Sequence, residues 1–225
     1  MNYPTRSVEL PWFGAARSPS PARRGHSHFG VSIWFTGRVL LLVRHGRTAA
    51  NAARKLQGRL DLPLDDVGAA QVAAIAEWLG RPDRLISSPL LRARQTADAF
   101  GVLYEVDERW IELDYGTLDG VPVADVGDEI WARWRVDPHY QPGGGESLTV
   151  MHDRVIAAAE ELLADAHEQT IVVTTHVSPI KAAMTWALGV DVTVGWRCHL
   201  DQASVCRIAS GPHGPVVLGF NETRR

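Results

Sequence analysis

Residues 39–43, Val-Leu-Leu-Leu-Val, constrain the fold of this 225-residue chain more than any other stretch. Consecutive apolar residues between Gly37 and Gly46 predict a strand that is buried on both faces. Such a strand belongs at the centre of a parallel sheet, where helices cover both sides. Directly after it come Arg44 and His45. Because ligands of open α/β sheets bind at this carboxyl edge, the pair indicates a reactive histidine beside an anion.

A second β-branched run ends in the same way. Residues 170–175 read Thr-Ile-Val-Val-Thr-Thr and predict another central strand, which His176 follows directly. A third strand end is predicted at residues 85–88, and the helix after it carries Arg92 and Arg94. The carboxyl ends of parallel strands share one edge of a sheet, so these groups are expected to converge there. Guanidinium groups match phosphate oxygens pairwise, and the set therefore suits a phosphate group.

The remaining elements complete one α/β domain, expected over residues 38–225, with a largely parallel central sheet and helices on both faces. Asp65 and Ser147 are predicted helix caps, since each stands just before an apolar stripe of helical period. The other expected elements are a short helix and loop over 51–59, helices over 66–79, 87–100, 147–162 and 178–189, an edge strand at 103–106, and a closing hairpin from 203–208 and 215–220.

Residues 1–37 differ in composition from the rest. Prolines at positions 4, 11, 19 and 21 interrupt any helical or strand period, so an extended or poorly ordered tail is expected. The tail has four arginines against one glutamate, or +3, which leaves −6 for the remainder of a chain whose net charge is −3. An acidic body argues against a nucleic-acid partner.

The sequence also argues against a membrane-spanning protein and against a disulfide-stabilised one. No apolar run approaches the roughly 20 residues that a membrane span needs. Cys198 and Cys206 match neither a disulfide framework nor a zinc site, and reduced thiols in a cytoplasmic protein are expected. The sequence does not indicate an oligomeric state.

Five short motifs follow one another between residues 38 and 223. They are Arg44-His45-Gly46 with Thr48 and Asn51, Ser87–Ala93, Glu112–Gly116, Gly144–Ser147, and His176. Together and in this order they resemble the histidine phosphatase superfamily, also called phosphoglycerate mutase-like. The resemblance implies a three-layer fold with a phosphate pocket at the carboxyl edge of the sheet.

The resemblance also implies a role for each matched residue of the pocket. His45 is expected to be the nucleophile that becomes phosphohistidine, with its side chain exposed at the strand end. Arg44, Arg92 and His176 are expected to bind the phosphate, with Asn51 lining the pocket. From the residues alone, Arg94 remains an alternative to Arg92.

Glu112 resembles the acid that protonates the leaving oxygen and later draws a proton from water. Asp114, two residues further on, is the alternative for this role. Fixed cations, a neutral imidazole and one carboxyl can complete both steps, so no metal and no cofactor are expected.

The sequence leaves two alternatives for each residue that could recognise the organic part of a substrate. Arg59 is either a second anchor for substrate or a solvated loop charge. Trp131 and Trp134 are either part of a small side-core or an apolar wall that faces substrate. Arg47 and Val177 depart from the family's usual glutamate and glycine at these positions, which leaves the specificity undecided.

The function predicted from the sequence is hydrolysis of small-molecule phosphomonoesters. The alternatives are a phosphoglycerate-type mutase and a catalytically silent binding or regulatory member. A silent member is disfavoured because every expected catalytic residue is present. Only 64 positions separate Glu112 from His176. About half of them belong to predicted regular elements, so the cover over the pocket is expected to be short and to admit water.

Overall fold

The computed structural model describes residues 39–166 and 169–224, all within the unit Phe35–Arg225. The tail predicted for residues 1–37 lies outside the described residues. In the described part, no helix combines the length and the apolar character that a membrane span requires.

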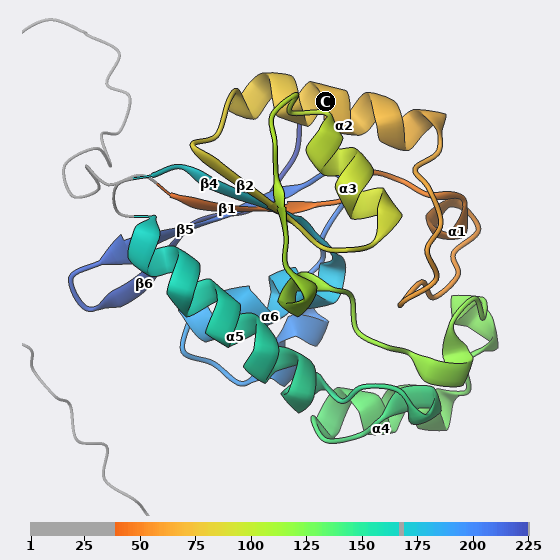
Figure 1. The fold of residues 1–225 in the computed structure, drawn as a ribbon. Helices are drawn as coiled ribbons and strands as arrows, with labels where there is room; N and C mark the ends of the chain where they lie inside the picture. The colour runs from red at the N-terminus through yellow and green to blue at the C-terminus, as the bar shows by residue number, and fades with distance from the viewer. Residues whose placement is uncertain (1–38, 167–168, 225) are drawn as a thin grey trace, which may run out of the picture. The chain divides into compact units, whose positions relative to one another are not determined.

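A six-stranded sheet forms the middle layer of the fold (Figure 1). Its strands are, in spatial order, β3 (Glu105–Val106), β2 (Arg84–Ser87), β4 (Ile171–Thr175), β1 (Leu40–Arg44), β5 (Val205–Gly211) and β6 (Gly214–Glu222). The first four pair in parallel, whereas β5 is antiparallel to both β1 and β6. The largely parallel sheet and the closing hairpin predicted from the sequence are therefore confirmed.

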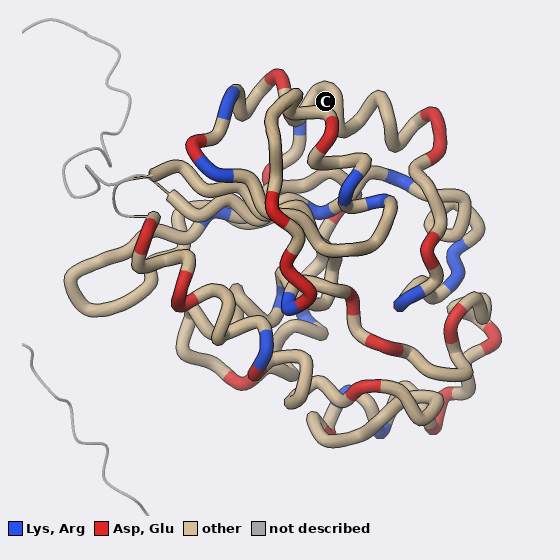
Figure 2. Tube along the Cα trace, viewed as in Figure 1, with Lys and Arg blue, Asp and Glu red and all other residues tan. Residues whose placement is uncertain are grey.

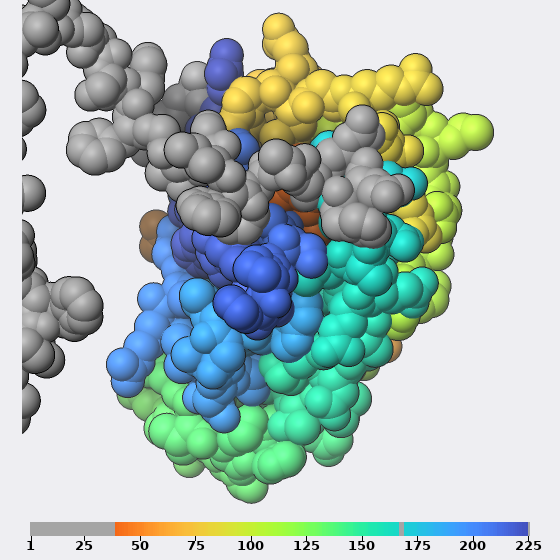
Figure 3. Space-filling model, turned by 90° about the vertical axis from the view of Figure 1, so that its left-hand side faces the viewer, coloured from red at the N-terminus to blue at the C-terminus, as the bar shows by residue number. Residues whose placement is uncertain are grey.

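Helices cover both faces of this sheet (Figure 1). One face carries α2 (Asp66–Leu79) and α3 (Leu91–Asp98), and the other carries α5 (Leu148–Asp165) and α6 (Val177–Ala187). Alternate residues of β1 belong to different layers, since Leu41 packs with the α2 side and Leu42 with the α5 side. Burial on both faces explains why the whole strand is apolar. Figure 3 shows the C-terminal hairpin between the segments of α5 and α6.

The predicted helix caps at Asp65 and Ser147 are confirmed. The Asp65 side chain accepts a hydrogen bond from the Gly68 N–H at 2.8 Å, and the Ser147 hydroxyl accepts one from the Val150 N–H at 3.3 Å. Each bond satisfies an amide that has no partner inside its helix.

Two helix starts predicted from the sequence were wrong. The helix expected from residue 87 begins only at Leu91, because Leu90 has extended backbone. The Ser88 hydroxyl lies 2.6 Å from His176 Nε2 and accepts a hydrogen bond from the Leu90 N–H at 3.4 Å. The helix expected after residue 51 is α1 (Ala49–Ala52), which begins earlier because Thr48 caps it.

The segment between Trp110 and residue 145 is irregular, as expected. It consists of short 3₁₀ turns and one helix, α4 (Asp128–Val136), which carries Trp131 and Trp134. Their rings stack at a centroid distance of 5.4 Å, and Trp134 is almost fully buried. The two tryptophans therefore form part of a side-core, and Trp134 also lines a pocket described below.

Two glycines bring the start of α2 against the loop that follows β1. A Cβ atom at Gly68 would lie 2.1 Å from the Arg47 carbonyl oxygen, and one at Gly46 would lie 2.5 Å from the Gly68 oxygen. Real Cβ atoms do not approach so closely, so the helix and the histidine loop can pack here only without side chains.

We predict that Gly68→Ala destabilises the protein by about 1–3 kcal/mol, because the backbone of Arg47 must move away from the new methyl group. At a solvent-exposed position inside a helix, replacing Gly by Ala would instead stabilise the protein by about 1 kcal/mol. The sign of the change in unfolding free energy therefore shows whether the close approach exists. Urea denaturation measures the effect. Gly127→Ala is the matched control, since the nearest atom to its Cβ is 3.9 Å away. Equal stability of the two variants would contradict the close approach.

Candidate active site

His45 follows the last residue of β1 and lies at the carboxyl edge of the sheet. Its side chain is buried, with 4% of the residue exposed, so the expectation of an exposed position was wrong. The Nδ1 atom lies 2.7 Å from the Gly46 carbonyl oxygen, and Nε2 accepts a hydrogen bond from the Arg92 Nε–H at 3.2 Å. Together these contacts place the proton on Nδ1 and a lone pair on Nε2. Burial, reinforced by Arg92 and Arg44, holds the pKa of His45 well below its usual value.

Arg92 holds this imidazole from α3. The guanidinium is fully buried and also donates to the carbonyl oxygens of Leu60 and Gly58, both at 2.8 Å, and of Gln57 at 3.3 Å. Burial lowers the pKa of Arg92 to about 10, so it remains a cation at neutral pH. Of the two arginines at the start of α3, the one that contacts His45 is therefore Arg92.

His176 lies beside His45 from the neighbouring strand end. The ring centroids are 5.1 Å apart, and the Nε2 atom of His176 is 2.6 Å from the Ser88 hydroxyl. Burial, with Arg92 as the next cause, lowers the pKa of His176 well below its usual value. Three strand ends, those of β1, β2 and β4, thus meet at one point, as the sequence predicts.

Two buried polar atoms of this cluster have no hydrogen-bond partner among the described residues. They are Nδ1 of His176 and Nε of Arg44, whose Nη1 donates to the Leu200 carbonyl oxygen at 2.6 Å. Buried polar atoms without partners are rare in folded proteins. The cluster can accommodate an anion whose oxygens satisfy such groups.

Glu112 is buried on the same side of the sheet edge. Its Oε1 accepts hydrogen bonds from the backbone N–H groups of Leu113 at 2.8 Å and Ser178 at 3.3 Å. Burial raises the pKa of Glu112, against the opposing effect of Arg92 and Arg44. A raised pKa favours the protonated form of this carboxyl.

Asp114 has a different environment. Its side chain is 37% exposed, accepts from the Gly116 N–H at 2.8 Å and lies 3.8 Å from Arg59 Nε. Asp114 thus faces solvent and a loop cation, whereas Glu112 is buried and feels the charges of Arg92 and Arg44.

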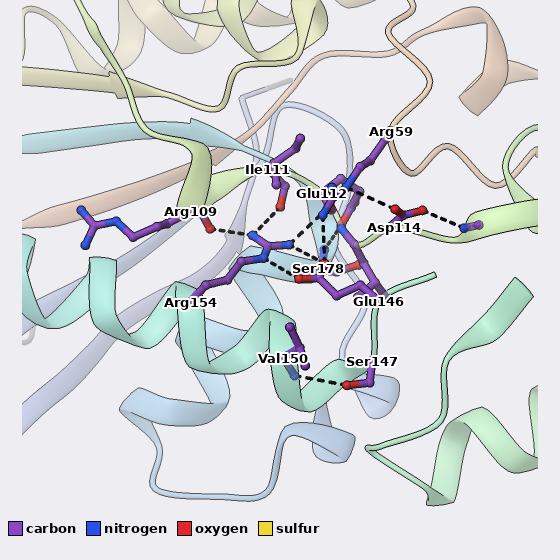
Figure 4. Close-up of polar contacts among 12 residues, drawn as sticks. Arg59, Arg109, Ile111, Glu112, Asp114, Glu146, Ser147, Val150, Arg154 and Ser178 are labelled. Carbon is purple, nitrogen blue, oxygen red and sulfur yellow. Dashed lines mark hydrogen bonds and ion pairs between the residues drawn. The ribbon is translucent and has the colours of Figure 1, made fainter. Parts of the chain in front are cut away.

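Hydrogen bonds from the Arg154 side chain fix the segment of chain that leads to Glu112 (Figure 4). The Arg154 guanidinium binds both oxygens of Glu146 at 2.8 Å and donates to the carbonyl oxygens of Arg109 at 2.6 Å and Ile111 at 2.8 Å. The motif at residues 144–147 therefore contributes a structural anion. Neither Arg154 nor the backbone N–H of Ser178 was singled out in the sequence, and no side-chain pattern reveals a backbone donor.

The remaining candidates make their hydrogen bonds and ion pairs with residues other than the two histidines. Asn51 exchanges hydrogen bonds with Thr48, both at 3.2 Å, in the cap of α1. Arg59 is half-exposed and lies 3.5 Å from Glu146. The Arg47 side chain binds Asp65 at 2.9 Å.

The positive charge at the site is local. Figure 2 shows basic and acidic residues interspersed along the trace, and the chain as a whole has a net charge of −3. Among the described residues, no group of three or more His, Cys, Asp or Glu side chains could hold a metal ion.

The depressed pKa of His45 predicts a pH-dependent stability. The folded state excludes a proton that the unfolded state binds below about pH 6.5, so stability is present above that pH and is lost as the pH falls. The slope contributed by one such histidine approaches about 1.4 kcal/mol per pH unit. His45→Gln should therefore flatten the decline between pH 7 and pH 5.5 in urea denaturation, whereas the exposed His139→Gln should not. Parallel slopes for wild type and His45→Gln would contradict the neutral, buried imidazole.

Comparisons with known proteins agree with this geometry. A bifunctional protein of Mycobacterium tuberculosis is 35% identical over 206 residues, which cover 85% of this chain and 57% of that protein. Phosphoserine phosphatase 1 of Hydrogenobacter thermophilus is 34% identical over 194 residues, or 82% of this chain and 92% of that one. The structure of a mycobacterial glucosyl-3-phosphoglycerate phosphatase with VO3 matches with a TM-score of 0.75 and 29% identity, over 83% of this chain and 100% of that one.

The chain thus spans little more than half of the mycobacterial bifunctional protein. The family model that describes the histidine phosphatase superfamily (branch 1) matches residues 40–223. This chain belongs to the histidine phosphatase superfamily.

Proposed function

We propose that this chain hydrolyses small-molecule phosphomonoesters through a phosphohistidine at His45. The observation that carries the proposal is the buried, neutral imidazole, whose Nε2 lone pair meets the Arg92 guanidinium. A nucleophile of this kind is ready to attack without first losing a proton. The names of the relatives, phosphoserine phosphatase and glucosyl-3-phosphoglycerate phosphatase, support the same class of substrate.

In the first step the phosphate displaces the hydrogen bond between Arg92 and His45. Arg44, Arg92 and His176 bind its oxygens, and Asn51 lines the rim. His45 Nε2 attacks phosphorus in line with the ester oxygen, so a P–N bond forms as the P–O bond to the alcohol breaks. The fixed cations stabilise the charge on the equatorial oxygens, and the Nδ1 hydrogen bond to the Gly46 carbonyl steadies the charged imidazole.

Glu112 acts in both steps. Its raised pKa keeps a proton available for the departing alkoxide, and the resulting carboxylate then takes a proton from water. The water oxygen attacks phosphorus, the P–N bond breaks, and phosphate leaves with His45 neutral again. The mechanism requires no metal and no cofactor.

Water must reach the phosphohistidine for this outcome. Between Glu112 and β4 the described cover consists of α4 and short 3₁₀ turns before α5 begins. This short cover supports hydrolysis over a phosphoglycerate-type mutase, which shields its intermediate from water. A mutase would interconvert 2- and 3-phosphoglycerate with little release of free phosphate.

A cytoplasmic location remains an expectation from the two free cysteines, Cys198 and Cys206.

Leaving-group chemistry tests the proposal. An alkoxide requires a proton in the transition state and p-nitrophenolate scarcely does, so Glu112→Gln should lose about 100-fold or more on an alkyl phosphate and less than about tenfold on p-nitrophenyl phosphate. Steady-state kcat/KM with both substrates, in EDTA, measures the difference. Asp114→Asn is the matched control and should keep the wild-type ratio. No hydrolysis of either ester by wild type would refute the function, and equal losses would refute the role of Glu112.

A further inference from the structure

A pocket lies next to the chain segment that carries Glu112, and the mechanism above does not use it. Its wall includes Leu113 and Ser178, the two residues whose backbone N–H groups hold the Glu112 carboxylate. Tyr115, Trp134 and Trp196 provide aromatic surface further in. The pocket therefore adjoins the backbone that holds the proposed proton donor.

Lys181 is the only cationic residue among the described residues that line the pocket. It follows His176 by five residues on α6, which corresponds to about 7.5 Å along a helix axis. Its stem packs against Gly195, where an added Cβ would lie 3.3 Å from the Lys181 Cβ. Over residues 39–166 and 169–224 its ammonium group has no hydrogen-bond or ion-pair partner. Burial lowers the pKa of Lys181, as expected for a cation that is partly desolvated and unpaired.

The hydroxyl groups of Tyr115 and Ser178 also line the wall; they lie 3.3 Å apart, and either can donate to the other. The indole Nε1 atoms of Trp134 and Trp196 are buried and have no hydrogen-bond partner among the described residues. None of the described residues that line the pocket is acidic. An anionic ligand with an apolar body fits this wall, because its charge can pair with Lys181 and its body can pack on the aromatic rings.

We propose that the pocket selects phosphomonoesters whose organic part is a flat ring that carries a carboxylate, and that Lys181 binds this carboxylate. The inference rests on the proposed phosphatase activity and adds the class of substrate to it. An ammonium–carboxylate hydrogen bond in a partly buried site is strong enough to discriminate between ligands. The aromatic wall holds the ring between the carboxylate and the phosphate.

A matched pair of esters tests the inference. The phosphate monoesters of 4-hydroxyphenylacetate and of its carboxamide have closely similar leaving groups and differ in one charge. Wild type should prefer the carboxylate by about tenfold or more in kcat/KM, through KM rather than kcat. Lys181→Met should abolish the preference and leave the carboxamide ester unaffected. Lys55→Met, which changes the only other lysine of the chain at an exposed position, should keep it.

A second measurement separates this inference from the phosphatase proposal. Unphosphorylated 4-hydroxyphenylacetate should change the tryptophan fluorescence of wild type at lower concentration than its carboxamide does, and Lys181→Met should remove the difference. Thermal melting checks that the variant is folded. Equal binding and turnover of acid and amide by wild type would overturn the role of Lys181. Failure to hydrolyse either ester, with the binding preference intact, would overturn only the phosphatase activity.

Discussion

The site depends on one contact, the hydrogen bond from the buried Arg92 guanidinium to Nε2 of His45. A buried guanidinium is costly unless its donors are satisfied, and three backbone carbonyls in residues 57–60 satisfy the rest of the Arg92 fork. The loop at 57–60 and the start of α3 are thereby fixed to the strand that carries His45. Burial is the main reason that the pKa of His45 is depressed and Arg92 adds to it, so this contact sets the geometry of the proposed nucleophile and contributes to its neutral state.

The second half of the site is held by a different network. Within the described part of the chain Glu112 has no ion pair, and backbone N–H groups hold its carboxylate. The chain before it is fixed by Arg154, which is in turn paired with Glu146. The amide donors and the two arginines lower the pKa of Glu112, but burial outweighs them and the pKa stays raised, as general acid catalysis needs. Burial therefore has opposite consequences at the two groups: it favours the neutral imidazole of His45 and the protonated carboxyl of Glu112.

Much of this arrangement could be predicted from the sequence, because it follows from strand order and burial. The apolar run of β1 and the β-branched run of β4 fixed the centre of the sheet, and their carboxyl ends placed His45 and His176 together. What the sequence could not reveal depends on tertiary contacts. The burial of His45 results from Arg92 and the loop beneath it. The late start of α3 reflects the extended backbone of Leu90, and the Ser88 hydroxyl before it lies 2.6 Å from His176 Nε2.

The central claim is that a phosphoryl group passes through His45. The most direct measurement is to mix wild type with a phosphate-labelled ester, stop the reaction within milliseconds by denaturation in base, and map the label by mass spectrometry. The account predicts a label on His45 that is stable in base and lost in acid, and none in His45→Ala. Steady turnover with no labelled histidine, or with the label on another residue, would contradict it.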